Sequence, residues 1–513
     1  MLNKNLNKIQ ILDCTLRDGG YYTNWDFNQD LVDKYFEQIN KLPLDYVEIG
    51  YRSTIKEEYN GAFYYLPPYL MEECSQKCDK KLAIILNEKE VDLGNVEELL
   101  NPCKGLISLV RLAVAPENME RATQLAKKVK SLNFEIGFNV MYASKWDLDN
   151  LFNEQLKQIN KIADYFYVVD SYGGLYPIDV ENIILKIKES LDIPIGFHGH
   201  NNLELALVNS LQALKSGAQI IDSTILGMGR GAGNLKTELL LTILNNQELM
   251  EIDYDALYRL TELFAPLQNK YKWGTNLPFM ISGSFSLPQD AVISKIKKRY
   301  QSLNSIVRDN VITSEQNRTQ NKNFPVFHPI ENFDAVMIIG GGSTTLENDN
   351  AHIQFLKENP NTALIFVSSK NINAFAETEN ASYHCLVGNE AERFMKISQK
   401  QKIENKRFII SNASTFIPFS IEKFTFKIPS TDLEDQFEGS ATALALQIGK
   451  TLEMKTIYLT GFDGYQTDIQ PEEIELFQEN QILFDKIKQK GIAIFSLTPT
   501  LYEVEVKSIY SLF

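Results

Sequence analysis

The sequence predicts an α/β protein made of a (β/α)8 TIM barrel followed by a C-terminal Rossmann-like α/β domain. Two observations carry this prediction. Eight short apolar or β-branched runs alternate with amphipathic helical patterns in the first half, and a similar alternation restarts after residue 330. Eight strands joined by right-handed crossovers close into a barrel, with an open doubly wound sheet as the alternative.

The first half supplies eight expected strands and the helices between them. The expected strands are residues 9–15, 45–50, 81–87, 106–114, 134–141, 165–171, 193–200 and 219–224. Apolar residues recur every three or four positions, as in amphipathic helices, over 30–41, 116–131, 148–163 and 203–216. We therefore expect a barrel over 1–245 and a helical extension over 246–312.

The second half begins after a polar stretch, TSEQNRTQNKN, that has no apolar period. We place a linker at 313–330 and a second α/β domain, with an open parallel sheet, at 331–513. Its expected strands are residues 335–342, 362–369, 383–388, 407–411, 456–463 and 492–497.

Composition and charge exclude several classes of function. The 513 residues carry 51 Lys and Arg against 66 Asp and Glu, which gives a formal net charge of −15. An acidic protein repels a phosphate backbone, so we expect no nucleic acid and no membrane as partners. No apolar run is long enough to span a bilayer, and residues 1–8 lack a signal-peptide core. The sequence predicts a cytoplasmic protein whose five cysteines are reduced.

Polar and ionisable residues gather where the expected strands end. Active sites of (β/α)8 barrels lie at the carboxyl ends of the strands, so these residues are expected to share one rim. In chain order they are Arg17, Asp18, Glu48, Asn87, Arg111, Asn139, Asp170, Ser171, His198, His200, Asp222 and Thr224. A glycine-rich loop, GMGRGAGN, follows the eighth strand and ends in Asn234.

A divalent metal site is expected on this rim. His198 and His200 are two of only five histidines, and residues i and i+2 of a strand point to the same face. Asp18 and Asn234 can complete a set of nitrogen and oxygen ligands without a thiolate. Such a set suits Mn²⁺ or Mg²⁺, with Zn²⁺ and Co²⁺ as alternatives. Packing of both histidines as ordinary interior residues is the alternative to a metal site.

Arg17 is expected beside the ion. A guanidinium at that place can stabilise an oxyanion that develops on a carbonyl oxygen, such as an enolate. Glu48 is expected to orient Arg17 rather than to react, because a buried guanidinium needs a carboxylate partner.

The motifs resemble those of one family. The segments DCTLRDGG, VEIG, GFHGHNNLELALVNSLQALKSGAQIIDSTILGMGRGAGN and YKWGTNLPFMISG are similar to the pyruvate carboxyltransferase or HMG-CoA-lyase-like superfamily of metal-dependent barrels. The likeness covers about residues 8–300, and within the superfamily it points to 4-hydroxy-2-oxovalerate aldolase-like pyruvate aldolases. It implies a lyase that enolises a 2-oxo acid, expected to be pyruvate, and joins it to or releases an aldehyde.

The resemblance also implies roles position by position. The implied metal ligands are Asp18, His198, His200 and Asn234. Arg17 matches the residue that stabilises the enolate, and Glu48 matches its acidic partner. The expected substrate-binding residues are Ser171, Arg111 and Thr224.

One position departs from the family pattern. The aldolases carry a histidine shortly after TLRDG that acts as acid and base on the aldehyde's hydroxyl, whereas this chain continues with Tyr21 and Tyr22. Either tyrosine is a candidate proton donor, since a group with an ordinary pKa of about 10 is a better acid than base at pH 7. A metal-bound water is another candidate, and both tyrosines could instead only shape the pocket.

The second domain carries a glycine-rich turn, GGGSTT, after its first strand, and such a turn can cradle a phosphate. Residues 438–465 resemble a segment of sialyltransferase-like and 6-hydroxymethylpterin-diphosphokinase-like Rossmann families. We expect a site for a phosphorylated or nucleotide-linked ligand. Its candidate residues are Gly341, Gly342, Ser343 and Asp463.

Three functions compete. The first is a metal-dependent aldolase, whose aldehyde could be a sugar used in surface-polysaccharide synthesis. The second is a Claisen condensation of an acyl-CoA with a 2-oxo acid, as in isopropylmalate-synthase-like relatives. The third is a catalytically idle barrel that serves as a scaffold for the second domain. A homodimer is expected, with the helices after residue 240 as its interface.

Overall fold

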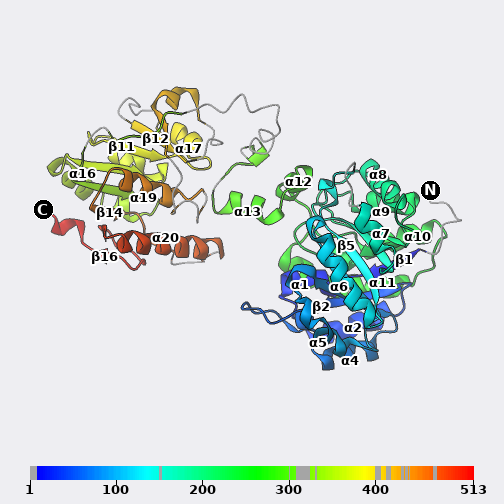
Figure 1. Ribbon diagram of the computed structural model, residues 1–513. Coiled ribbons are helices and arrows are strands. Elements are labelled where there is room, and N and C mark those ends of the chain that lie inside the picture. Colours follow the sequence, from blue (N-terminus) through cyan, green and yellow to red (C-terminus); the bar gives the residue numbers. More distant parts are fainter. Residues whose placement is uncertain are drawn as a thin grey trace. The chain divides into compact units, whose positions relative to one another are not determined.

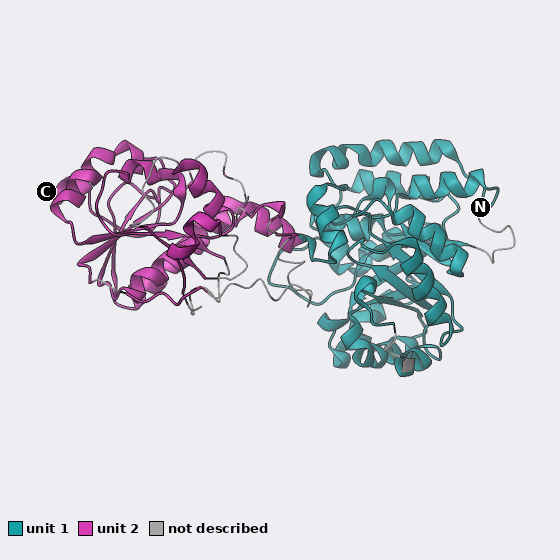
Figure 2. Ribbon diagram, turned by 90° about the horizontal axis from the view of Figure 1, so that it is seen from above, with its two compact units in different colours: residues 1–289 teal, residues 290–513 magenta. Residues whose placement is uncertain are grey.

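The computed structural model describes residues 9–148, 153–299, 301–304, 306–307, 324–329, 332–398, 406–411, 417–428, 433, 437, 439–465, 469 and 471–513. The chain forms two compact units, residues 1–289 and 290–513 (Figure 2). This division falls inside the expected helical extension at 246–312. Most of the expected linker at 313–330 lies outside the described residues.

The first unit is a closed barrel of eight parallel strands in sequence order, with β1 paired to β8 (Figure 1). The strands are β1 (Gln10–Asp13), β2 (Tyr46–Tyr51), β3 (Lys81–Asn87), β4 (Leu109–Val114), β5 (Glu135–Val140), β6 (Tyr165–Asp170), β7 (Ile195–Gly199) and β8 (Ile220–Ser223). Each one lies within or beside an expected segment. The prediction of a TIM barrel is confirmed.

Helices follow the strands and cover the barrel, and their apolar faces form one continuous core with the outward side chains of the strands. The helices are α1 (Thr15–Thr23), α2 (Gln29–Ile39), α3 (Ala62–Tyr65), α4 (Pro68–Lys77), α5 (Val96–Leu100), α6 (Met119–Ser131), α7 (Asn153–Ile159), α8 (Pro177–Lys188), α9 (Ala206–Ser216), α10 (Thr237–Asn246), α11 (Tyr254–Tyr271) and α12 (Leu277–Ser284). Inward side chains, including Tyr46 and Tyr167, form a separate cluster that fills the barrel. Because the interior is packed, chemistry is confined to the rim.

Strand β2 has an irregularity next to a site residue. Its pairing with β3 shifts register between Glu48 and Gly50. A Cβ atom on Gly50 would lie 1.9 Å from the backbone oxygen of Phe63, so only glycine allows α3 to approach β2 this closely. Irregular pairing near a barrel rim changes the direction of the side chains beside it, and Glu48 is one of the two residues between which the register shifts.

The second unit is built on an eight-stranded parallel sheet in the order β13-β12-β11-β10-β9-β14-β15-β16. The strands are β9 (Ala335–Ile339), β10 (Thr362–Phe366), β11 (Ser382–Cys385), β12 (Lys406–Ile410), β13 (Thr425–Lys427), β14 (Thr456–Thr460), β15 (Ala493–Ser496) and β16 (Glu505–Val506). The six expected strands are present. Strands β13 and β16 were not predicted, since three and two residues are too few to show a period.

Two cores lie on the two faces of this sheet. Along β9, Val336 and Ile338 belong to one core while Met337 and Ile339 belong to the other. Within the described residues of this unit the helices are α13 (Gln289–Lys297), α15 (Thr344–Glu347), α16 (Asp349–Glu358), α17 (Glu390–Ile397), α19 (Ala441–Thr451) and α20 (Pro471–Gln489). The strand order reverses at β9, and in open parallel sheets ligands bind at such a switch point. Among the described helices of the chain, none has the length and apolar character that a membrane span requires.

Candidate active site

The run TLRDGG follows the first strand as expected, but it lies on helix α1 and not at a strand end or in a loop. Asp13 fixes the start of this helix, because its carboxylate accepts hydrogen bonds from the backbone nitrogen and the hydroxyl of Thr15, at 2.9 and 3.0 Å. The hydroxyl of Tyr35 donates to the same carboxylate at 2.6 Å. This anchor places Arg17 and Asp18 in the first turns of α1, at the rim of the barrel.

Six ionisable side chains form a closed ring of contacts at this rim. In order round the ring they are Arg17, Glu48, Arg111, Asp222, His198 and Asp18. Arg17 contacts Asp18 through Nη1, and its Nε atom donates to Oε2 of Glu48 at 2.6 Å. The other carboxylate oxygen of Glu48 lies 3.2 Å from Nη1 of Arg111. One carboxylate therefore serves two guanidinium groups.

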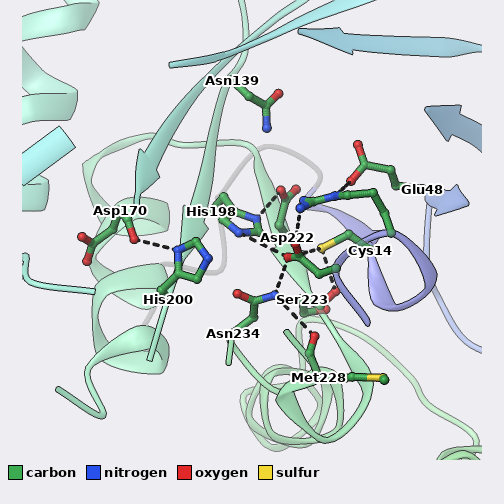
Figure 3. Close-up of polar contacts among 12 residues, drawn as sticks. Cys14, Glu48, Asn139, Asp170, His198, His200, Asp222, Ser223, Met228 and Asn234 are labelled. Atoms are coloured by element: carbon green, nitrogen blue, oxygen red, sulfur yellow. Dashed lines mark hydrogen bonds and ion pairs between the residues drawn. The ribbon is translucent and has the colours of Figure 1, made fainter. Parts of the chain in front are cut away.

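The ring closes through a histidine (Figure 3). Arg111 contacts Oδ2 of Asp222, and the Nδ1 atom of His198 lies 2.8 Å from the same oxygen. The Nε2 atom of His198 lies 3.6 Å from Oδ2 of Asp18. Three carboxylates face two guanidinium groups, so the ring carries one net negative charge while His198 is neutral. Such a charge balance favours a bound cation.

Both histidines present a neutral ring nitrogen to the site. Burial lowers the pKa of His198 well below its ordinary value, and burial also lowers the pKa of His200. Nδ1 of His200 lies 2.9 Å from the backbone oxygen of Asp170, while Nδ1 of His198 is held by Asp222. In each ring Nε2 is left as the free nitrogen, as a metal ligand requires.

The glycine-rich loop brings Asn234 to the same place. Backbone pairing between His200 and Asn234 ends the loop beside β7. The side-chain nitrogen of Asn234 donates to Oδ2 of Asp18 at 2.5 Å, and its side-chain oxygen is buried without a hydrogen-bond partner. A Cβ atom on Gly229 would lie 2.5 Å from that nitrogen, and one on Gly233 would lie 2.2 Å from the backbone oxygen of Gly227. These glycines let the loop fold tightly over the site.

The donor set fits a divalent metal ion. The lone pair of His198 Nε2 faces a carboxylate oxygen of Asp18 across 3.6 Å, and a cation bound between these two acceptors would be stabilised by both. The unpartnered oxygen of Asn234 adds a third donor of the kind that hard divalent ions prefer.

The sulfur of Cys14 also lies within 4.8 Å of Asp18 and His198, and this neighbour was not predicted from the sequence. Burial raises the pKa of the Cys14 thiol well above its ordinary value. Among the described residues this tight group does not include His200, whose ring centre is 5.0 Å from that of His198.

The three expected substrate-binding residues have different surroundings. Arg111 is completely buried, stacks on the ring of Tyr167 at 4.1 Å and is bound to Glu48 and Asp222. The hydroxyl of Thr224 is buried without a hydrogen-bond partner. Ser171 is half-buried, and its hydroxyl accepts a hydrogen bond from the backbone of Tyr142 at 2.8 Å. Arg111 is therefore part of the charge ring, while Thr224 retains an unused hydroxyl.

The two tyrosines of α1 differ in their partners. Tyr21 is 42% exposed, and its hydroxyl lies 3.0 Å from that of Tyr51. The hydroxyl of Tyr22 donates to the backbone oxygen of Gly231 in the glycine-rich loop at 3.3 Å, and burial raises its pKa. Since residues four apart share a helix face, Tyr22 lies on the side of α1 that carries Asp18.

A separate cavity of about 680 Å³ lies in the second unit at the carboxyl ends of β9, β10, β11 and β14. The four predicted residues Gly341, Gly342, Ser343 and Asp463 line it. The carboxylate of Asp463 accepts hydrogen bonds from the backbone nitrogen, at 3.1 Å, and the hydroxyl of Thr344. An acidic side chain thus already occupies part of the glycine-rich turn where we expected a phosphate.

Comparisons with known proteins show the family of the chain. Residues 108–264 match the HMGL-like family. A 4-hydroxy-2-oxovalerate aldolase from Geobacillus thermodenitrificans is 32% identical over 266 residues, which are 50% of this chain and 76% of the relative. The chain belongs to the HMGL-like family. This HMGL-like chain is also 26% identical to an oxaloacetate decarboxylase from Mycobacterium tuberculosis over 251 residues, 48% of the chain and 74% of the relative.

A solved structure resembles the barrel of this HMGL-like protein. It is the crystal structure of the N-terminal domain of a Bacteroides vulgatus protein assigned provisionally as an aldolase. The two are 49% identical with a TM-score of 0.57, and the match covers 59% of this chain and all of that domain.

Proposed function

We propose that the barrel is a divalent-metal-dependent aldolase or lyase that enolises a 2-oxo acid, with pyruvate as the best candidate. The single observation that carries the proposal is the cluster of Asp18 and His198 beside the Arg17 guanidinium, with the buried, unpartnered oxygen of the Asn234 side chain next to it. We propose Mn²⁺ or Mg²⁺ as the ion, held by these three residues and His200. When bound, the ion would polarise the carbonyl group of the 2-oxo acid and so favour transfer of a proton from its methyl carbon to solvent water.

Arg17 supplies the second positive charge. Burial alone would lower the pKa of its guanidinium, but Asp18 and Glu48 raise it well above the ordinary value. Arg17 therefore stays charged while the carbonyl oxygen of the substrate becomes an enolate oxygen, and it stabilises that oxygen. Glu48 keeps the guanidinium in place, and Ser171 and Thr224 are proposed contacts of the substrate carboxylate.

The enolate then attacks an aldehyde carbon, and the aldehyde oxygen must gain a proton. We propose Tyr22 as the donor, since its hydroxyl proton is held only by a long contact of 3.3 Å to the backbone oxygen of Gly231. Tyr21 is the second candidate, and its hydroxyl is engaged with Tyr51. In the cleavage direction the same tyrosine takes the proton back.

The experiment that tests this activity is an aldol assay. Purified full-length protein with Mg²⁺ or Mn²⁺ is incubated with pyruvate and a panel of aldehydes that includes short aliphatic aldehydes and sugars. Consumption of pyruvate that requires both the metal and one class of aldehyde supports the proposal. Release of free thiol from an acyl-CoA in the presence of pyruvate, without any need for an aldehyde, would favour a Claisen enzyme instead.

For the second unit we propose a Rossmann-like domain that binds a phosphorylated or nucleotide-linked ligand. The supporting observation is the cavity at the point where the strand order reverses between β9 and β14. A sugar aldehyde for the barrel and a nucleotide-linked sugar for this cavity would fit a role in polysaccharide synthesis. Calorimetry of the full chain with nucleotide sugars tests it, and absence of binding heat across the series would contradict it.

A further inference from the structure

The first unit contains a buried carboxylate that the mechanism above does not use. Asp222 lies on β8, its side chain is 1% exposed, and it touches no residue of the glycine-rich loop in the contacts described. We propose that Asp222 is a positioning residue that fixes the His198 ring for metal binding, and that Arg111 holds Asp222 in place. The inference rests on the proposed metal site but concerns a different step, the orientation of one ligand.

The contact geometry of Asp222 supports this role. One oxygen, Oδ2, meets both Nδ1 of His198 at 2.8 Å and Nη2 of Arg111. A carboxylate oxygen only accepts hydrogen bonds, so it selects the form of His198 that carries its proton on Nδ1. The proton-free nitrogen is then Nε2, which faces Asp18. An isolated imidazole can carry its proton on either nitrogen, so the contact with Asp222 is what fixes the proton of His198 on Nδ1.

Arg111 completes the arrangement from three directions. Its Nε atom donates to the side chain of Asn139 at 3.0 Å, Nη1 lies 3.2 Å from Glu48, and Nη2 contacts Asp222. A planar guanidinium with donors at fixed angles can satisfy all three partners, whereas a lysine ammonium cannot. The ring of Tyr167 lies against the guanidinium at 4.1 Å and restricts its movement. Arg111 thereby links the position of Asp222 to that of Glu48.

The second histidine gives an internal comparison. Nδ1 of His200 contacts the backbone oxygen of Asp170, so a change of side chain at position 170 keeps that acceptor. His198 instead depends on a side chain. Carboxylate partners of metal-bound histidines commonly contribute tenfold to hundredfold in metal affinity. Replacement of Asp222 should therefore disturb His198 and leave the acceptor of His200 unchanged.

The test follows the tautomer of His198 in the metal-free protein. The chain has only five histidines, so selective ¹⁵N labelling of histidine gives few signals to assign. In the wild-type chain we expect His198 to carry its proton on Nδ1. In Asp222→Asn the acceptor is lost or shared with an amide nitrogen, and we expect a mixture of tautomers or mainly the Nε2 form. The same two proteins are titrated with Mn²⁺, and we expect Kd to rise tenfold to hundredfold in Asp222→Asn.

A matched control separates positioning from general destabilisation. Glu88 is another buried carboxylate of the same unit, 1% exposed, and it pairs with Arg121 and accepts a hydrogen bond from Asn118 at 3.1 Å. Glu88→Gln breaks a carboxylate–arginine pair away from the charge ring, in which the carboxylate is as buried as Asp222 and the Arg121 side chain is 38% exposed. We expect it to leave the His198 tautomer unchanged and the Kd for Mn²⁺ within about threefold of the wild-type value, as for independent sites.

The outcomes are distinct. An Nδ1-protonated His198 that keeps this form in Asp222→Asn, with Kd changed no more than in Glu88→Gln, would overturn the inference. So would a wild-type His198 that carries its proton on Nε2. Should Asp222→Asn not fold, the His198 tautomer and the Kd for Mn²⁺ are measured in Arg111→Lys instead, and we expect a partial shift of the tautomer. A wild-type chain that binds no Mn²⁺ would instead contradict the proposed function, because the tautomer is measured without metal.

Discussion

Arg17 and Glu48 form a buried ion pair in which Nε of Arg17 donates to Oε2 of Glu48 at 2.6 Å. Glu48 is completely buried and also lies 3.2 Å from Nη1 of Arg111. A buried guanidinium is tolerated only with a carboxylate partner. Glu48 thus shares with Asp18 and Asp222 the neutralisation of two buried guanidinium groups.

Glu48→Gln is expected to destabilise the first unit. The amide removes one carboxylate contact from each guanidinium, while Arg17 keeps Asp18 and Arg111 keeps Asp222. Loss of a hydrogen bond to a charged group costs about 1.5–3 kcal/mol of unfolding free energy. All three tryptophans, Trp25, Trp146 and Trp273, lie in the first unit, so tryptophan fluorescence during urea unfolding reports on this unit alone.

The control for this prediction is an exposed ion pair. Lys34 contacts Asp30 at 2.6 Å on the surface of α2, with both side chains more than half exposed. Lys34→Gln should change the unfolding free energy by no more than about 0.5 kcal/mol. A similar small change for Glu48→Gln would contradict the described role of Glu48.

Tyr22→Phe is expected to separate two steps of the reaction. The substitution removes only a hydroxyl, and loss of a general acid typically costs about 10²–10⁴-fold in rate. We expect the aldol rate with an aldehyde to fall by this factor while exchange of the pyruvate methyl protons continues. Tyr21→Phe is the matched variant, and a larger effect on the aldol rate from Tyr21→Phe would assign the donor to Tyr21.

Asp170 is expected to make the metal-free protein less stable as the pH rises. Burial raises the pKa of its carboxyl to about 6, although Leu175 and Gly174 donate backbone hydrogen bonds to it. A raised folded-state pKa gives stability that is complete below the unfolded value near 4 and is lost as pH rises through 6. Relative to wild type, the unfolding free energy of Asp170→Asn should rise by about 2 kcal/mol between pH 4 and pH 7. Urea unfolding at both pH values, with a chelator present, measures this difference, and a constant difference would contradict it.

Asp463→Ala is expected to loosen the glycine-rich turn of the second unit. The backbone nitrogen of Thr344 loses its carboxylate acceptor, and removal of such a cap costs about 1 kcal/mol, or about fivefold in local opening. Hydrogen exchange of residues 340–347 should accelerate accordingly, while the tryptophan transition of the first unit stays unchanged. Asp485→Ala, at an exposed site on α20, serves as the control. Equal exchange in the turn for both variants would show that Asp463 does not hold it.

Most of the fold could be predicted from the sequence because apolar period and strand length are local properties. All eight barrel strands and six strands of the second sheet lie in or beside their expected segments. Helix α1 was missed because its two glycines and short length give no clear helical period. Strands β13 and β16 were missed because two or three residues carry no period at all.

The candidate site was predicted less completely. The pairing of Arg17 with Glu48 and the approach of Asn234 to Asp18 agree with the expected rim. The contact between Asp222 and His198 was not predicted, because it depends on the side-chain directions of two neighbouring strands. Arg111 was expected to bind substrate, and only the three-dimensional arrangement shows that its charge is taken up by buried carboxylates.

The most direct test of the account is proton exchange of pyruvate in D₂O, followed by NMR with Mg²⁺ as a diamagnetic ion. We predict that the wild-type chain exchanges the methyl protons only with metal, that a chelator or His200→Ala abolishes exchange, and that Arg17→Lys slows it by about 10²–10³-fold. The Lys34→Gln protein should exchange the methyl protons of pyruvate at the wild-type rate. Absence of exchange in metal-loaded protein, or exchange that survives both the chelator and the loss of Arg17, would contradict enolate chemistry in this barrel.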